Sequence, residues 1–321
     1  MNILVTGAAG FIGNAVAIAL LQRGDKVIGL DNMNDYYSVE LKEARLKRLN
    51  HDSQDSRIYR IDICDKEKLA SVFRDNKIDA VVHLAAQAGV RYSLENPQAY
   101  VDSNITGTLN IFECCRNFGV KNIVFASSSS VYGDNAKIPF STDDRTDNPV
   151  SLYAATKKSC ELMAHTYSHL FGLNIIGLRY FTVYGPWGRP DMAPMLFAKN
   201  ILEGKPIKVF NNGNMKRDFT YIDDIVNGTI SCLNHDTQDL RINRIFNIGR
   251  GEPVDLMRFI EILENELGKT AIKEFLPMQA GDVPVTWADT AALEKATGYS
   301  PKISLERGIK HFAEWYLEYK Q

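Results

Sequence analysis

The sequence is poor in the features that mark metal-binding, disulfide-bonded and nucleic-acid-binding proteins. Its 321 residues include five cysteines, and none stands in a CxxC pair or in the Cys/His spacing of a metal site. They lie inside apolar helix or strand patterns, so we expect reduced core residues of a cytoplasmic protein. The formal net charge is only −2, with both signs interspersed. This pattern offers no basic surface for a nucleic acid or an anionic membrane.

Long hydrophobic runs are also missing. The apolar stretch at residues 11–21 follows a glycine loop, has no basic segment before it and is too short to span a bilayer. No internal repeat or low-complexity tract is visible. We therefore expect a soluble cytoplasmic protein without a membrane or nucleic-acid partner, long enough for one large or two modest domains.

What the chain does contain is a βαβ pattern in residues 1–31. An apolar run at 3–5 leads into Gly7, Gly10 and Gly13, which open a helix pattern, and a second apolar run ends on Asp31. Such glycines permit a tight turn and a close approach to a pyrophosphate, which the helix N-terminus attracts. A carboxylate at the end of the second strand favours NAD over NADP, because it would repel a 2′-phosphate. An ordinary tight connection is the alternative, but it does not explain the terminal acid.

Strand and helix patterns continue to alternate as far as residue 180. This alternation predicts an α/β fold with a Rossmann-type, doubly wound parallel sheet. The strand pattern at 57–61 is followed by an Asp-Ile pair, which is expected to flank the adenine. The strand pattern at 80–84 is followed by small residues, which let the backbone approach the cofactor. The predicted cofactor residues are Gly7, Gly10, Phe11, Ile12, Gly13, Asp31, Asn32, Asp62, Ile63, Leu84, Ala85, Ala86, Tyr153 and Lys157.

A candidate catalytic set follows the strand pattern at 122–126. Ser127, Ser128 and Ser129 come at its carboxyl end, where open parallel sheets bind ligands. A serine-rich turn would explain this run if it stood alone. A helix pattern after Ser151, however, places Tyr153 and Lys157 four apart on one face. Phenols are poor bases at neutral pH, and a nearby ammonium favours the phenolate. A Tyr and a Lys four apart are also common on surface helices. Together with the serines and the glycine loop, however, they resemble the Ser–Tyr–Lys set of the short-chain dehydrogenase/reductase superfamily. This resemblance implies Tyr153 as general base, Lys157 as its activator and ribose ligand, and Ser128 as the holder of the substrate hydroxyl.

Residues 1–180 are thus predicted to form a cofactor domain, and residues 181–321 a smaller α/β substrate domain. A segment at about 217–250 could rejoin the large sheet. Short strand patterns at 209–210 and 217–219 flank an Asn-Asn-Gly turn. Helix patterns at 256–267, 293–296 and 309–319 are expected to cover the substrate cleft.

With the glycine loop and the Ser–Tyr–Lys set, the chain resembles extended short-chain dehydrogenase/reductases of the nucleotide-sugar epimerase group. The resemblance covers essentially the whole chain and is closest to UDP-glucuronate 4-epimerases at residues 31–49, 184–192 and 281–289. It implies an isomerase that interconverts UDP-glucuronate and UDP-galacturonate through a 4-keto sugar, for polysaccharide biosynthesis. NAD would stay tightly bound and be regenerated in each turnover.

The resemblance also implies a homodimer and a set of substrate contacts. The helices at 97–118 and 151–171 would form a four-helix bundle, and their apolar Leu109, Phe112, Leu162, Met163 and Leu170 fit this interface or the core equally. The implied substrate residues are Ser127, Ser128, Ser129, Thr182, Arg189, Arg217, Gln279, Asp282 and Thr286.

Roles within this set differ. Thr182 and Arg189 match positions that meet the sugar carboxylate, which an arginine fork can bind bidentately. A pyrophosphate contact or a surface position is the alternative for Arg189. Arg217 resembles a diphosphate ligand and Asp282 a uridine-side ribose ligand. Gln279 replaces the arginine that is usual in the wider group.

Several alternatives stay open at this stage. A 4-epimerase of UDP-glucose or of a UDP-N-acetylhexosamine is one, because Thr286 leaves room in the sugar pocket. Decarboxylases and dehydratases of this group carry acidic residues where this chain has Ser129 and Ser130, so they are disfavoured. A non-catalytic NAD sensor would typically lack the Tyr–Lys pair. His165 and His169 lack a third ligand, so packing is favoured and no metal site is predicted.

Overall fold

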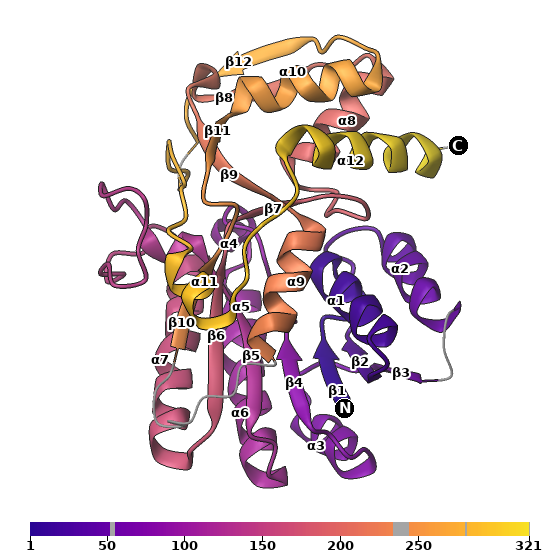
Figure 1. Cartoon of the computed structure of the whole chain (residues 1–321), viewed down its shortest axis with the longest axis vertical. Coiled ribbons are helices and arrows are strands. Elements are labelled where there is room, and N and C mark those ends of the chain that lie inside the picture. Colours follow the sequence, from indigo (N-terminus) through magenta and orange to yellow (C-terminus); the bar gives the residue numbers. More distant parts are fainter. Residues whose placement is uncertain (52–54, 234–243, 280, 321) are drawn as a thin grey trace.

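The computed structural model describes residues 1–51, 55–233, 244–279 and 281–320, and it contains a large sheet with helices on both faces (Figure 1). The elements around this sheet are β1 (Asn2–Thr6), α1 (Phe11–Gln22), β2 (Lys26–Asp31), α2 (Val39–His51), β3 (Ser56–Arg60), α3 (Lys66–Asp75), β4 (Ala80–His83), α4 (Tyr92–Glu95), α5 (Pro97–Tyr100), α6 (Gly107–Phe118), β5 (Asn122–Ser128), α7 (Leu152–Phe171), β6 (Asn174–Tyr180), α9 (Ile222–Leu233) and β10 (Arg244–Ile248).

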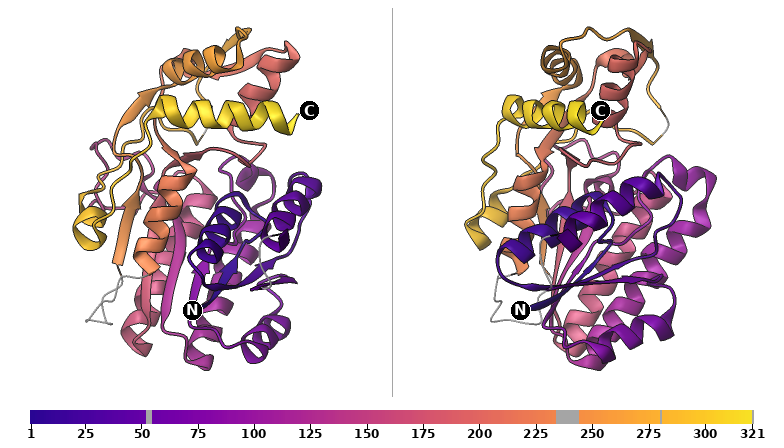
Figure 2. Two further views of the ribbon diagram at one scale, coloured as in Figure 1. Left: turned by 45° about the vertical axis from the view of Figure 1, so that its right-hand side comes forward. Right: turned by 90° about the vertical axis from the view of Figure 1, so that its right-hand side faces the viewer.

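The seven strands follow the order β10-β6-β5-β4-β1-β2-β3, and every neighbouring pair is parallel. Side chains alternate between the faces, because successive residues of a strand point to opposite sides. Ile3 and Val5 pack with α1 and α9, whereas Leu4 packs with α3, α6 and α7. Figure 2 shows helices on both faces of the sheet. This arrangement confirms the predicted doubly wound sheet. The strand order reverses between β1 and β4, which is where such sheets bind ligands.

The smaller part of the structure lies beyond the carboxyl ends of these strands (Figure 1). Its elements are β7 (Thr182–Tyr184), α8 (Ala193–Glu203), β8 (Ile207–Phe210), β9 (Lys216–Tyr221), β11 (Pro253–Asp255), α10 (Leu256–Leu267), β12 (Lys273–Leu276), α11 (Ala291–Thr297) and α12 (Leu305–Tyr319). They build a three-stranded sheet β11-β9-β7 and a two-stranded sheet β12-β8.

Two sequence expectations meet different outcomes here. The strand at 244–248 does rejoin the large sheet, where it pairs with β6. The strands on either side of the Asn-Asn-Gly turn also form, but β8 pairs with β12 and β9 with β7 and β11. Phe219 of β9 stacks on Phe259 of α10, with ring centroids 4.3 Å apart. This aromatic packing helps to hold β9 in the three-stranded sheet, away from β8.

The helix expected at 97–118 is interrupted by a π-helical turn at Val101–Thr106. This turn contains Asn104, whose side chain accepts a hydrogen bond from the Gln87 backbone N–H at 2.8 Å and donates to the Gln87 carbonyl at 3.1 Å. The Asn104 amide also donates to Thr156 Oγ1 of α7 at 3.0 Å. The turn therefore ties the loop after β4 to the helix that carries Tyr153. None of the helices within the described ranges is long and apolar enough to cross a bilayer.

Candidate active site

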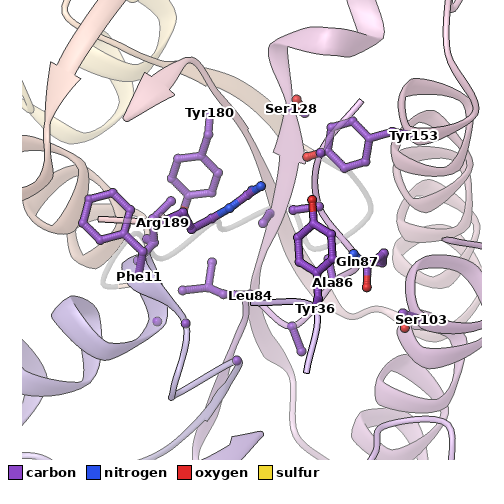
Figure 3. Close-up of a pocket in the computed structure, with 18 of the residues that line it drawn as sticks. Phe11, Tyr36, Leu84, Ala86, Gln87, Ser103, Ser128, Tyr153, Tyr180 and Arg189 are labelled. Atoms are coloured by element: carbon purple, nitrogen blue, oxygen red, sulfur yellow. The ribbon is translucent and has the colours of Figure 1, made fainter. Parts of the chain in front are cut away.

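A cavity of about 370 Å³ opens at the reversal of strand order, between the large sheet and the smaller part. Figure 3 shows Arg189, Tyr180 and Phe11 on one side of it, and Ser128, Tyr153 and Gln87 on the other. The cavity brings together all of the predicted cofactor residues and most of the predicted substrate residues. Those that line it are Gly7, Gly10, Phe11, Ile12, Gly13, Asp31, Asn32, Asp62, Ile63, Leu84, Ala85, Ala86, Ser127, Ser128, Ser129, Tyr153, Lys157, Thr182 and Arg189.

The glycine loop forms a cradle that side chains would fill. A Cβ on Gly7 would lie 2.9 Å from the Ala85 nitrogen, and Gly7 has a φ of +73°. A Cβ on Gly13 would lie 2.1 Å from the Gly7 carbonyl oxygen, so α1 can pack against the loop only without it. Gly10 begins α1 without a side-chain cap. The free N–H groups and the helix dipole therefore face the cavity, as a dinucleotide pyrophosphate requires.

The adenosine end of the cavity carries two fixed carboxylates. Asp31, 8% exposed, accepts hydrogen bonds from the backbone N–H groups of Ala9 at 3.1 Å and Met33 at 2.9 Å. Asp62 accepts from the Asn32 amide and from the Cys64 backbone N–H, both at 2.8 Å. Burial opposes ionisation of Asp62, but these hydrogen bonds hold its pKa below the ordinary value. Both side chains are thus preset as acceptors for ribose and adenine, which fits NAD.

The predicted catalytic residues meet at the end of β5. Ser151 caps α7 by accepting from the Ala154 N–H at 3.1 Å, which sets Tyr153 in the first turn of the helix. The ammonium of Lys157 donates to the Ala126 carbonyl at 2.8 Å. Ser128 Oγ accepts from the Ser130 N–H at 3.2 Å, and Figure 3 shows its side chain and that of Tyr153 at the cavity. Helix and strand therefore present phenol, ammonium and hydroxyl to one space.

Ser127 has a different environment from its neighbour. Its hydroxyl donates to Glu161 Oε1 at 2.7 Å, and Glu161 forms a bidentate ion pair with Arg179 at 2.8 and 2.9 Å. Both charged side chains are at most 4% exposed. Burial opposes ionisation of Glu161, but its hydrogen bonds and the charge of Arg179 lower its pKa. The Ser127 hydroxyl thus anchors the catalytic strand to α7.

The opposite wall of the cavity carries Arg189, the residue predicted to bind the sugar carboxylate. Arg189 pairs with Asp191 through Nε–Oδ1 at 3.1 Å and Nη2–Oδ2 at 2.5 Å. The Tyr36 hydroxyl donates to Asp191 Oδ2 at 3.1 Å. Burial and the charge of Asp191 raise the pKa of Tyr36 to about 12, so the phenol keeps its proton. Thr182 lines the same cavity from β7.

Four predicted substrate residues, Arg217, Gln279, Asp282 and Thr286, do not line this cavity. Residues 281–286 run beside β9, with the Lys216 N–H donating to Pro284 O at 2.9 Å and the Thr286 N–H to Lys216 O at 3.1 Å. Gln279 lies next to them, because its carbonyl accepts from the Asp282 N–H at 3.3 Å. Arg217 donates to Pro284 O at 3.1 Å, and burial lowers its pKa. Among the described residues, Gln279 Oε1 is buried and without a hydrogen-bond partner.

Sequence reasoning missed several residues that the structure places at the cavity. These are Tyr36, Tyr37, Lys42, Gly89, Val90 and Ser103. A weak signal existed for the loop after β4, because its small residues continue beyond Ala86 to Gly89. His165 and His169 stack on the exposed side of α7, 6.4 Å apart, and no group of three His, Cys, Asp or Glu side chains in the described ranges could hold a metal ion.

Comparison with known proteins agrees with this geometry. Residues 3–249 match the model of the NAD dependent epimerase/dehydratase family. The chain is 50% identical over 316 residues to a UDP-glucuronate 4-epimerase of Thermodesulfobacterium geofontis, covering 98% of this chain and 96% of that protein. It is 49% identical over 337 residues to UDP-glucuronate 4-epimerase 4 of Arabidopsis thaliana, covering 99% of this chain and 76% of the relative.

A solved structure is similar over the same length. The UDP-glucuronic acid 4-epimerase of Bacillus cereus, in complex with UDP-glucuronic acid and NAD, superposes with a TM-score of 0.92 at 38% identity. The match covers 99% of this chain and 100% of that one. With a dinucleotide cradle, a Ser–Tyr–Lys set and these relatives, the chain belongs to the NAD-dependent epimerase/dehydratase family.

Proposed function

We propose that the chain is an NAD-dependent 4-epimerase that interconverts UDP-glucuronate and UDP-galacturonate through a transient 4-keto sugar. The observation that carries this proposal is the position of Arg189. Its guanidinium shares one cavity with Tyr153 and Thr182 (Figure 3). An arginine fork that is 20% exposed and shares the cavity of the catalytic phenol suits a sugar carboxylate, which a neutral hexose lacks.

The residues divide the chemistry between them. Bound NAD supplies the hydride acceptor and donor at sugar carbon 4. Tyr153 takes the proton from the 4-hydroxyl as the hydride leaves, and it returns that proton when the hydride is added to the opposite face. Ser128 holds the reacting oxygen through its hydroxyl. Lys157, which β5 fixes through the Ala126 carbonyl, brings its ammonium to the same cavity as the phenol. The cycle has no net redox change.

The serines at the end of β5 favour epimerisation over elimination. Ser129 and Ser130 supply neither acid nor base for the loss of water or carbon dioxide. A 4-keto uronate is a β-keto acid. It loses carbon dioxide when the bond to its carboxylate is aligned with the π system of the ketone. We infer that Arg189 and Thr182 hold the carboxylate out of that alignment. The same chemistry with UDP-glucose or a UDP-N-acetylhexosamine is the second candidate.

The nucleotide end of the substrate is proposed to bind beside β9. Arg217 and Asp282 are brought near each other there, and the charge of Asp282 partly compensates the buried guanidinium. Arg217 would hold the diphosphate and Asp282 the uridine ribose. Gln279 would contribute its carboxamide, whose Oε1 is buried and lacks a partner among the described residues.

The test of this function needs no added cofactor. Purified protein is incubated with UDP-glucuronate, and the sugar nucleotides are separated by chromatography. The appearance of UDP-galacturonate is the expected result and also indicates retained NAD. UDP-glucose and UDP-N-acetylglucosamine are run in parallel. Conversion of one of these without conversion of UDP-glucuronate would keep the mechanism and overturn the role given to Arg189.

We further propose a homodimer through the outer sides of α6 and α7. Of the apolar residues expected there, Leu109, Leu162 and Leu170 are 37%, 59% and 62% exposed, whereas Phe112 is buried in the core. Exposed leucines gathered on two adjacent helices suit a four-helix interface. Light scattering should give the mass of a dimer, and the double variant Leu162→Asp/Leu170→Asp the mass of a monomer. Ile272→Asp, at an equally exposed site in the smaller part, is the matched control.

A further inference from the structure

Arg45 of α2 is a fully buried cation that connects three separate segments. Its exposed fraction is 0%. Nε and Nη2 both donate to the Trp187 carbonyl, at 3.1 and 2.6 Å, and Nη2 also donates to Gly188 O at 3.0 Å. Nη1 donates to Ala9 O at 3.0 Å and to the Tyr37 hydroxyl at 2.8 Å. The guanidinium is therefore saturated with neutral acceptors.

The charge of Arg45 lacks a close counter-ion. Within the part of the chain that the structure describes, no carboxylate lies at ion-pair distance from it, and the charge of Asp31 acts only from further away. Burial disfavours the charged form of Arg45 and lowers its pKa, and the distant Asp31 offsets this only in part. A buried charge of this kind is costly unless a negative group compensates it. Ala9, one of its acceptors, lies in the glycine loop between Gly7 and Gly10, where a dinucleotide diphosphate would bring negative charge.

The other end of this connection lies next to Arg189. Trp187 has a φ of +63°, a left-handed conformation that is strained for a bulky residue and persists only where its surroundings impose it. The hydrogen bonds from Arg45 hold its carbonyl and that of Gly188. The Trp187 ring packs against the guanidinium of Arg48 at 4.8 Å and against Trp315 at 5.4 Å. Two residues further on, Arg189 enters the cavity.

We propose that Arg45 is a positioning residue that couples dinucleotide occupancy of the glycine loop to the placement of Arg189. The guanidinium of Arg45 fixes the strained turn at 187–188. The diphosphate of the dinucleotide stabilises this guanidinium by compensating its charge. Tyr36, from the loop after β2, makes a parallel link through Asp191. Arg189 is then correctly placed to bind the sugar carboxylate only when the cofactor is present. This inference rests on the proposed function for the role of Arg189, but the coupling itself does not depend on the identity of the sugar.

The experiment measures hydrogen exchange in the segment 185–192, with and without NAD and without any sugar nucleotide. Protein stripped of its cofactor is compared with the same protein reloaded with NAD. In the wild type, NAD should slow exchange at 187–189 by at least about fivefold, the lower end of ordinary site-to-site coupling. Arg45→Lys keeps the charge but cannot form the five-donor fork. In this variant, NAD should slow hydrogen exchange in the glycine loop but not at 187–189.

Two further variants make the result decisive. Tyr37→Phe removes one acceptor and should lose part of the response, which keeps the test valid if Arg45→Lys fails to fold. Arg60→Lys is the matched control, since Arg60 also forms a bidentate contact with α2, to Glu43, but does so at the surface. The inference is overturned if NAD does not slow exchange at 187–189 in the wild type. It is also overturned if NAD slows this exchange in Arg45→Lys and Tyr37→Phe as much as in the wild type.

A kinetic readout separates positioning from general loss of structure. If UDP-glucuronate is the substrate, Arg45→Lys should raise its KM more than tenfold while kcat falls less than threefold, because Tyr153 and Lys157 stand on a different helix. The KM of Arg60→Lys should stay at the wild-type value. An unchanged KM in Arg45→Lys would contradict the coupling. Failure of the wild type to convert UDP-glucuronate would instead overturn the proposed function and leave the exchange result standing.

Discussion

Asp191 holds the guanidinium of Arg189 along one edge, through Nε at 3.1 Å and Nη2 at 2.5 Å. Burial disfavours the charge of Arg189, but the carboxylate of Asp191 raises its pKa above the ordinary value. The group therefore stays charged at every physiological pH. Because the contact uses one edge of the planar fork, the Nη1 edge is left to meet a second carboxylate.

Arg189→Ala should weaken binding of the uronate selectively. Hydrogen bonds to charged groups contribute about 1.5–3 kcal/mol, which corresponds to a rise of about 10- to 150-fold in the KM of UDP-glucuronate. A leak of the UDP-pentose formed by loss of carbon dioxide should accompany it, measured by chromatography of the sugar nucleotides. UDP-glucose, whose sugar carries no carboxylate, is the control ligand, and its binding should be unaffected. Normal epimerisation of UDP-glucuronate without any leak would show that Arg189 does not hold the carboxylate.

Tyr153→Phe should abolish turnover without releasing NAD. Removing a general acid–base group lowers kcat by about 10²- to 10⁴-fold, while the ring still packs against Tyr100. Activity and the NAD content of the purified protein are the two measurements. Tyr167→Phe, on the same helix but bonded to Glu113, should keep full activity. Full turnover in Tyr153→Phe would show that Tyr153 is not the acid–base group. No turnover in the wild type, with NAD retained in both proteins, would point to a non-catalytic NAD sensor.

Glu161→Gln should be among the most destabilising single substitutions in the chain. It leaves the buried Arg179 without a counter-charge, and the single carboxamide oxygen must serve both Arg179 and the Ser127 hydroxyl. Breaking a buried pair in this way costs about 3–5 kcal/mol, measured as the free energy of unfolding in urea. Glu113→Gln on α6, whose carboxylate is 27% exposed, should lose less than about 1 kcal/mol. Equal losses in the two variants would contradict the account of this pair.

His83 should make the fold sensitive to acid. Its ring is buried between Thr6 and Thr108, and burial, with a further contribution from the charge of Lys157, lowers its pKa to about 3. The unfolded chain binds a proton near pH 6.5, whereas the folded chain does not. The stabilisation is therefore complete above that pH and is lost as the pH falls toward 3, by up to about 1.4 kcal/mol per unit.

The variant His83→Gln tests this source of acid sensitivity. Urea unfolding at pH 7 and pH 5 should show a smaller loss of stability for the variant than for the wild type. His165→Gln, on the exposed side of α7, should leave the pH dependence unchanged. The assignment is refuted by an identical slope in His83→Gln and the wild type.

The parts of the site that the sequence predicts depend on local patterns. Gly7, Gly10 and Gly13 lie within one turn and the start of one helix, and Asp31 ends the next strand. Tyr153 and Lys157 are four residues apart on α7. Such spacings can be read from the chain directly, because the backbone geometry of a helix or strand fixes where the side chains go.

The parts that could not be predicted depend on distant contacts. Arg45 reaches carbonyls 142 and 143 residues away, and Tyr36 reaches a carboxylate 155 residues away. In the sequence, Arg45 is one more charge in an alternating helix pattern, which normally indicates a solvent-exposed face. The π-helical turn is equally invisible, because its cause is the pairing of Asn104 with Gln87. The partners of β8 and β9 likewise follow from the packing of Phe219 on Phe259.

The late return of β10 to the large sheet has a consequence for biosynthesis. β6 is buried along its whole length, yet its outer edge is covered by a strand that the ribosome makes roughly 70 residues later, a delay of about 3–14 s at ordinary rates of translation. During that delay the nascent chain displays an unprotected apolar edge, the kind of surface that recruits chaperones or seeds aggregation. A fragment truncated after Tyr180 would keep that edge permanently, so the cofactor-binding part cannot be expressed cleanly by cutting the gene at that point.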